Sequence, residues 1–320
     1  MQQVNTVTGP IPVEELGRTL MHEHVLIAWP GWELDSAYRF DREAALQRAI
    51  EALSEIKSLG VDSLVDPCPM ELGRDPEFLA EVSAGSGVRI ICATGLYYER
   101  LGIPTYFKQR TIDEIAEIYV REITEGIGGT GIRAGIIKCA TGLNRIGKHE
   151  EKALRAAARA SKATGVPVTT HTEGGTMGPE QLDVFASEGL DLGQVVIGHS
   201  CGSPNLEYHL KMLDRGATIG FDRIGLEMLL PDKIRLAALV GLIGAGYADQ
   251  IVLSQDHVAC HAGRPLARED VLETMGKPSF AYLIKDFLPR VEATGVARST
   301  IDSMMIGNPR RLFERATRQA

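Results

Sequence analysis

The chain has 320 residues, of which 44% are hydrophobic and 24% charged, and its formal net charge is −8. This composition is typical of a globular protein, and the acidic balance without a basic block argues against a nucleic-acid partner. No apolar run approaches the ~18 residues of a membrane span, so we expect no membrane partner. Five scattered cysteines and no signal-peptide pattern predict a cytoplasmic protein with reduced thiols.

The first residues predict an extended hairpin over 3–13, because Gly9-Pro10 marks a turn. Eight apolar, strand-like segments follow, each ending in polar or small residues: 19–27, 63–66, 89–93, 134–139, 167–172, 194–199, 217–222 and 250–255. Helical patterns alternate with them at 42–59, 76–84, 112–123, 150–164, 180–188, 206–214 and 233–243. Two more helices are expected after the eighth strand, at 280–294 and 299–315.

Alternating buried strands and helices imply a parallel sheet with right-handed crossovers. Eight such units predict an α/β fold, a (β/α)8 TIM barrel with a short N-terminal hairpin and extra C-terminal helices. No linker or charge run divides the chain, so we expect residues 1–320 to form a single domain. In such a barrel the chemistry lies at the C-terminal ends of the strands.

Six metal-ligating or basic residues fall at these predicted strand ends. They are His22 and His24 on the first strand, Lys138 on the fourth, His171 on the fifth, His199 on the sixth and Asp256 on the eighth. The first two are at i and i+2, so on an extended strand their imidazoles point to one face. The lysine lies in an apolar run, where an unpaired ammonium is costly, so it should be neutralised, paired or modified.

Imidazole and carboxylate ligands suit Zn, Co, Mn or Fe, so the strand-end residues predict a metal site. One ion could use His22, His24 and Asp256, and a second ion could use His171 and His199. The residues by themselves identify no bridge between the two ions.

The same residues carry a family resemblance. The chain resembles the amidohydrolase superfamily, and within it the phosphotriesterase family and its phosphotriesterase-like lactonases. The matching segments are Thr6-Val7-Thr8-Gly9-Pro10-Ile11, Leu20-Met21-His22-Glu23-His24-Val25, Gly135-Ile136-Ile137-Lys138-Cys139-Ala140, Phe221-Asp222-Arg223 and Gly307-Asn308-Pro309. The resemblance implies that Lys138 is carbamylated and, with a hydroxide, bridges two divalent metal ions, most often zinc. It also implies a homodimer, and a substrate held by Tyr97 (or its neighbour Tyr98) and Arg223.

A binuclear site predicts hydrolysis by a metal-bridging hydroxide, because metal coordination lowers the pKa of water from about 16 toward about 7. Asp256 is the expected proton acceptor, with Asp222 or His257 as an outward relay. An apolar rim suits lactones, and it includes Trp29, Trp32, Tyr97, Tyr98, Leu226, Met228 and Leu229.

Within the family, a short seventh loop and a long eighth loop, here 257–278, resemble the lactonases. The expected substrates therefore include N-acyl-homoserine lactones, with side activity on organophosphate triesters. A dedicated phosphotriesterase and a carboxylesterase or amidase are the alternatives. The sequence departs from the lactonases that act on N-acyl-homoserine lactones at Gln255 and 257–261, which leaves the substrate open.

Three other motifs compete with this interpretation. Residues 198–202 fit GxSxG and favour a serine hydrolase with Ser200 as nucleophile, Asp249 or Asp256 as acid and His257 or His261 as base. That alternative lacks an HGGG-type segment and leaves the other strand-end residues unexplained. Residues 126–131 fit GxGxxG in the reverse structural context, and 142–148 fit GxxxxGK but are followed by His149 instead of a hydroxyl residue.

Overall fold

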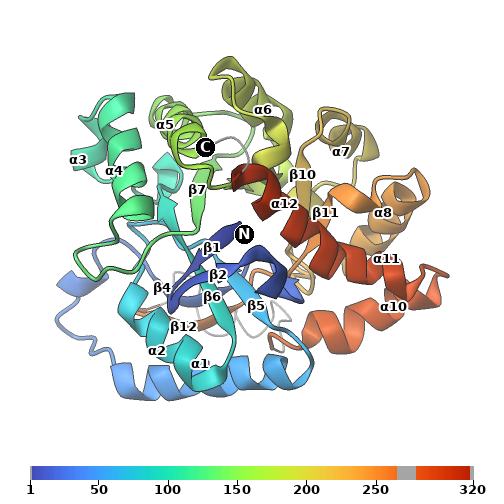
Figure 1. Cartoon of the computed structure of the whole chain (residues 1–320), viewed down its shortest axis with the longest axis horizontal. Coiled ribbons are helices and arrows are strands. Elements are labelled where there is room, and N and C mark those ends of the chain that lie inside the picture. The colour runs from blue at the N-terminus through green and yellow to red at the C-terminus, as the bar shows by residue number, and fades with distance from the viewer. Residues whose placement is uncertain (1, 265–278, 318–320) are drawn as a thin grey trace.

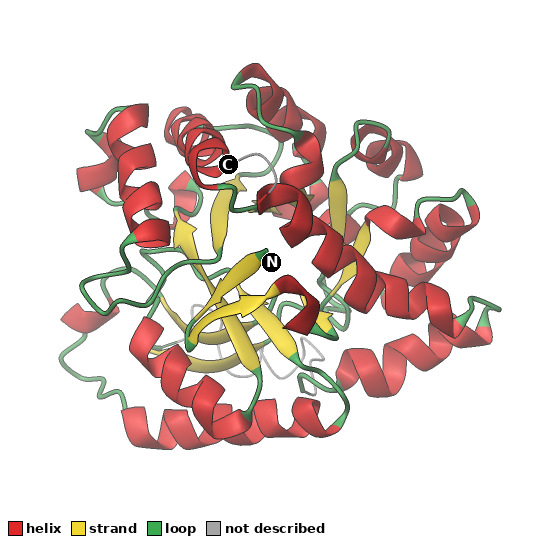
Figure 2. Ribbon diagram, in the orientation of Figure 1, coloured by secondary structure: helices red, strands yellow, loops and turns green. Residues whose placement is uncertain are grey.

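The computed structural model describes residues 2–264 and 279–317. Eight parallel strands form one sheet surrounded by helices (Figures 1 and 2), which confirms the predicted barrel. In sheet order the strands are β11 (Ile251–Leu253), β10 (Thr218–Phe221), β9 (Val195–Ile197), β8 (Val168–Thr172), β7 (Ile136–Thr141), β6 (Arg89–Gly95), β5 (Ser63–Asp66) and β3 (Thr19–Leu20). The two edges are joined by a parallel pair that continues them, β4 (His24–Ala28) and β12 (Val258–Ala262).

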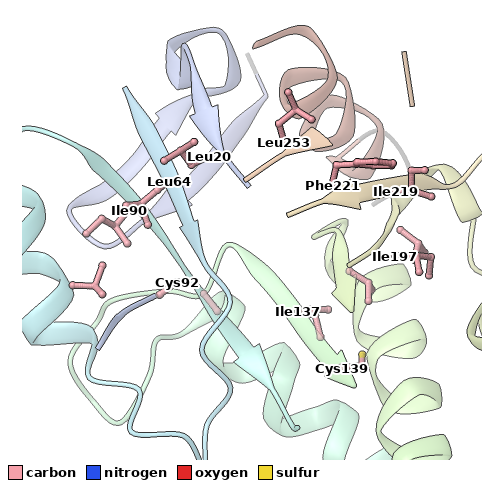
Figure 3. Close-up of a cluster of buried hydrophobic side chains, with 14 of the residues drawn as sticks. Leu20, Leu64, Ile90, Cys92, Ile137, Cys139, Ile197, Ile219, Phe221 and Leu253 are labelled. Atoms are coloured by element: carbon pink, nitrogen blue, oxygen red, sulfur yellow. The ribbon is translucent and has the colours of Figure 1, made fainter. Parts of the chain in front are cut away.

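Alternation along each strand separates two layers of apolar side chains, because successive residues point to opposite faces. One layer packs against the helices, and Figure 3 labels ten of its members: Leu20, Leu64, Ile90, Cys92, Ile137, Cys139, Ile197, Ile219, Phe221 and Leu253. Their neighbours on the same strands form a separate cluster inside the barrel, which includes Val65, Ile91, Ile136, Val196 and Val252. Lys138 lies two residues after Ile136, so its side chain also faces inward.

Helices follow the strands as predicted, and several begin and end with recognisable caps. Asp41 and Asp75 accept hydrogen bonds from the first turns of their helices, and Gly165 ends another helix in the left-handed conformation. The helices are α1 (Arg42–Ser58), α2 (Pro76–Ser86), α3 (Thr105–Lys108), α4 (Ile112–Thr124), α5 (Lys148–Thr164), α6 (Gly178–Ser187), α7 (Leu206–Leu213), α8 (Asp232–Gly244), α10 (Leu288–Ala293), α11 (Arg298–Asp302) and α12 (Asn308–Thr317). The short α3 was not predicted.

The N-terminal hairpin consists of β1 (Gln3–Thr6) and β2 (Gly9–Pro12) and lies at the centre of the ring in Figure 1. The Asn5 side chain donates to the carbonyl of Ala134, two residues before β7. The hairpin therefore closes the N-terminal end of the barrel and leaves the opposite end for the strand-end residues. Among the described residues, no helix is long and apolar enough to cross a membrane.

Two predicted segments differ from the structure by more than their end positions. The first strand, expected over 19–27, is interrupted at 21–23, where the carboxylate of Glu23 accepts the N–H of Gln255, two residues after the end of β11. The eighth loop, expected over 257–278, begins with β12, since residues 258–262 pair with β4. The rest of that loop, 265–278, lies outside the described residues.

Candidate metal centre

Five of the six strand-end residues meet at the open end of the barrel. Ligand atoms of His22, His199 and Asp256 all lie within 4.8 Å of one another. Nζ of Lys138 is 3.3 Å from Nε2 of His22, and Nε2 of His24 is 3.4 Å from Oδ1 of Asp256. All five side chains are buried or nearly so. Residues separated by more than 200 positions in sequence therefore form one cluster.

His171 lies beside this cluster, with its ring centroid 4.6 Å from that of His199. Its two nitrogens face other partners, the Tyr97 hydroxyl at 3.0 Å from Nδ1 and Oε2 of Glu173 at 2.8 Å from Nε2. Tyr98 stacks on the same ring, with centroids 5.4 Å apart and an interplanar angle of 9°. Tyr97 therefore contacts the site through its hydroxyl and Tyr98 through its ring.

Two buried carboxylates orient the histidines, and the sequence analysis missed this role. Oδ1 of Asp66 is 3.3 Å from Nδ1 of His24, and Oδ1 of Asp222 is 3.0 Å from Nδ1 of His199. Because Nδ1 is held in this way, Nε2 of each ring is left for a metal ion. Both aspartates close a strand of the barrel, which is the signal that could have identified them.

Burial keeps most of these imidazoles neutral, which is the form that binds metal. Desolvation lowers the pKa of His22 and of His171 to about 4, and it lowers the pKa of His199 in the same direction. His24 is different: burial alone would lower its pKa, but hydrogen bonds to Asp256 and Asp66 raise it well above 6.5. The carboxylates around His24 thus favour positive charge at this position, and a bound metal ion would provide that charge in place of the proton.

Lys138 is only 1% exposed, and desolvation lowers its pKa to about 8. A substantial fraction of this side chain is therefore the neutral amine near pH 8, in contrast to an exposed lysine. Neutral imidazoles, an inward amine and the Asp256 carboxylate form a donor set that fits divalent transition-metal ions.

A cavity of about 230 Å³ opens above the cluster. Its polar floor contains His22, His24, Lys138, His199 and Asp256, and its walls include Ile27, Trp29, Leu72, Leu226, Leu229 and Val258. Tyr97 and Arg223 also line it, and Nε of Arg223 donates to Oδ2 of Asp256 at 3.1 Å. Of the other expected rim residues, Trp32 packs edge-on against Phe40 and Met228 is 53% exposed.

The competing motifs do not assemble a second site. Ser200 is fully buried, and its hydroxyl donates to the Ile197 carbonyl at 2.7 Å, so it is not presented as a nucleophile. Asp249 bonds instead to Ser303 and Arg311 near the C-terminus. Residues 126–131 form the turn before β7, and the N–H of Gly147 is occupied by Glu150.

Glu71 leads to a prediction about pH and stability. It lies beside the cavity-lining Leu72 and accepts the Tyr97 N–H, and burial raises its pKa from 4.5 to about 7. Between these values the folded protein binds more protons than the unfolded one, so its free energy of unfolding falls as pH rises. We expect Glu71→Gln to remove the cost of ionising this buried carboxyl group. The free energy of unfolding of Glu71→Gln, relative to that of wild type, should therefore rise by up to about 3 kcal/mol from pH 5 to pH 8.

Urea unfolding of both proteins at the two pH values, with the same metal supplement, measures this difference. Glu117→Gln on the exposed side of α4 is the matched control and should show no such trend. If the difference in free energy of unfolding between Glu71→Gln and wild type did not change with pH, the prediction would be wrong.

Comparisons with known proteins place this site in context. A model of the phosphotriesterase family matches residues 2–313. The chain is 38% identical over 326 residues to a phosphotriesterase homology protein of Mycobacterium tuberculosis, with 98% of each chain covered. It is 33% identical to an aryldialkylphosphatase of Saccharolobus solfataricus, over 95% of this chain and 96% of that protein. The crystal structure of a mutant PTE-like lactonase from Deinococcus radiodurans superposes with a TM-score of 0.93 at 42% identity, over 97% and 99% of the two chains.

Proposed function

Because the chain belongs to the phosphotriesterase family of ester-bond hydrolases, we propose that it is a binuclear metal enzyme that opens lactones. The observation that carries the proposal is the cavity with nitrogen and oxygen ligands on its floor and apolar side chains on its walls. N-acyl-homoserine lactones are the proposed substrate class, with organophosphate triesters as side substrates. The apolar walls suit an acyl chain, and the polar floor suits an ester carbonyl.

We assign one metal ion to His22, His24 and Asp256 and the other to His171 and His199. Zinc is the first candidate, and cobalt, manganese and iron are the others. When bound, the two ions would activate a water molecule and polarise the carbonyl oxygen of the substrate. His171 would have to exchange its contact with Tyr97 or Glu173 for the metal.

Lys138 is the proposed bridge, as a carbamate formed with carbon dioxide. The neutral amine nitrogen would form a bond to the carbon of CO2 while one C=O π pair moves to oxygen, and the nitrogen would release a proton to solvent. A neutral amine would thus become a carboxylate-like anion. Two observations support this role: the lowered pKa, which provides neutral amine, and the inward position 3.3 Å from Nε2 of His22.

Asp256 is the proposed proton acceptor, since its carboxylate lies on the cavity floor. As the attacking water forms a bond to the acyl carbon, Asp256 takes its proton and delivers it to the ring oxygen when the C–O bond breaks. Arg223 holds Asp256 in place through its Nε–H. Burial raises the pKa of Tyr97, so its hydroxyl stays protonated and can donate to the substrate.

Removal of metal tests the proposed function. We expect a chelator to abolish hydrolysis and divalent metal to restore it, with about two ions per chain by elemental analysis. Ser200→Ala should keep full metal-dependent activity. Full activity with less than one ion per chain would contradict the binuclear site, and loss of activity in Ser200→Ala at normal metal content would favour the serine hydrolase.

A panel of lactones, carboxyl esters, amides and phosphotriesters then separates the substrate classes. We expect the highest kcat/KM for lactones with long acyl chains. A preference for phosphotriesters or simple esters would identify the alternative enzymes instead. Organisation as one domain, a homodimer and a cytoplasmic location stay predictions.

A further inference from the structure

Glu23 lies between the two histidines of the first strand and is fully buried, yet no step above uses it. Its carboxylate faces away from the cavity, toward the backbone that carries Asp256. Oε1 accepts the Ser254 hydroxyl at 2.7 Å and the Gln255 N–H at 2.9 Å, and Oε2 accepts the His257 N–H at 2.8 Å. One side chain in the break between β3 and β4 thus receives three hydrogen bonds from the segment around Asp256.

Backbone bonds complete the connection between the two strands. The His22 N–H donates to the Ser254 hydroxyl at 2.9 Å, and the Asp256 N–H donates to the His22 carbonyl at 3.1 Å. The His24 N–H donates to the His257 carbonyl at 2.8 Å. The backbones of His22, His24 and Asp256 are therefore fixed relative to one another through the residues that contact Glu23.

Asp256 needs this support because its φ is +55°, in the left-handed region that a residue with a side chain rarely occupies. Such a conformation persists only where the surroundings determine it strongly. Gln255 and His257 flank Asp256 on both sides, and Glu23 holds the N–H groups of both.

We propose that Glu23 is a positioning residue that holds Asp256 in the geometry required for metal binding and proton transfer. This inference rests on the proposed metal centre. The carboxylate is required because three donors converge on two acceptor oxygens. A glutamine has only one acceptor oxygen, and its NH2 group would face one of the donors without forming a hydrogen bond. The two carboxylate oxygens of Glu23 both accept hydrogen bonds.

The test compares Glu23→Gln with wild type by chelator competition for metal and by steady-state kinetics. We expect metal affinity and kcat each to fall by about 10- to 100-fold, as for other residues that orient metal ligands, while KM stays unchanged because the cavity walls are intact. Amide hydrogen exchange in residues 254–257 should accelerate with or without metal. Ser254→Ala removes one of the three donors. It should change metal affinity, kcat and amide hydrogen exchange in the same direction as Glu23→Gln, but by less.

Glu150→Gln is the matched control. Glu150 is another buried carboxylate that accepts three backbone N–H groups, from Glu99, Gly142 and Gly147, in a different loop. The Glu150→Gln variant should lose about as much stability as Glu23→Gln but keep the metal affinity of wild type. Equal metal loss in both glutamine variants, or unchanged metal affinity in Glu23→Gln, would overturn the positioning role. If the wild-type protein bound no metal, the proposed function would be overturned. The positioning role would still be tested by amide hydrogen exchange, and an unchanged exchange rate at residues 254–257 in Glu23→Gln would overturn it.

Discussion

Lys138→Ala should lose both metal ions and reduce kcat/KM by about a thousandfold or more, because several kcal/mol of metal-dependent stabilisation disappear. The alanine leaves a space on the cavity floor next to His22, and the bridging anion can no longer form. A small carboxylate such as acetate or propionate should enter that space and restore part of the metal content and activity. Elemental analysis and lactone hydrolysis, each with and without the carboxylate, measure the effect.

Cys139→Ala is the matched control for this variant. Cys139 is the next residue on β7, but it points away from the barrel interior toward the helices (Figure 3). Its truncation should lower the free energy of unfolding and leave the metal content unchanged. Unchanged metal content in Lys138→Ala would contradict the bridge, whatever happens to the activity.

Asp256→Asn is expected to lower kcat by about a thousandfold, within the range of about 100- to 10,000-fold for loss of a positioned general base. An amide oxygen can still approach a metal ion, so this variant should keep more metal than Lys138→Ala. The amide cannot take the proton from the attacking water, however. The combination of substantial metal content and very low kcat at saturating substrate is the expected signature.

Asp249→Asn supplies the comparison, since Asp249 bonds to Arg311 and Ser303 far from the cavity. Its kinetics should equal those of wild type. If Asp249→Asn were inactive and Asp256→Asn active, the proton-transfer role proposed for Asp256 would be wrong.

The sequence alone determined the barrel and the end of it that carries the chemistry. Strand periodicity accounts for part of this success: side chains at i and i+2 of an extended segment face the same way, and His22 and His24 do line the same cavity. Parallel strands in one barrel also bring their C-terminal ends to the same rim, which predicts from the sequence that His22, His171, His199 and Asp256 lie close together.

Tertiary structure decided the contacts that cross between strands. The sequence contains Glu23 and Asp66, but nothing local shows that the first bonds to the strand of Asp256 and the second to the ring of His24. The first strand is also interrupted at 21–23, against the prediction of a continuous strand. The pKa shifts also required the structure, because desolvation and partner charges depend on distance in space.

The sequence thus determined which residue types reach the open end of the barrel, because local periodicity and strand polarity fix direction. Only the fold decided how those groups are held, which nitrogen of His24 and of His199 faces Asp256 and how Asp256 keeps its left-handed backbone. These features depend on hydrogen bonds between positions more than 20 residues apart, and often more than 200.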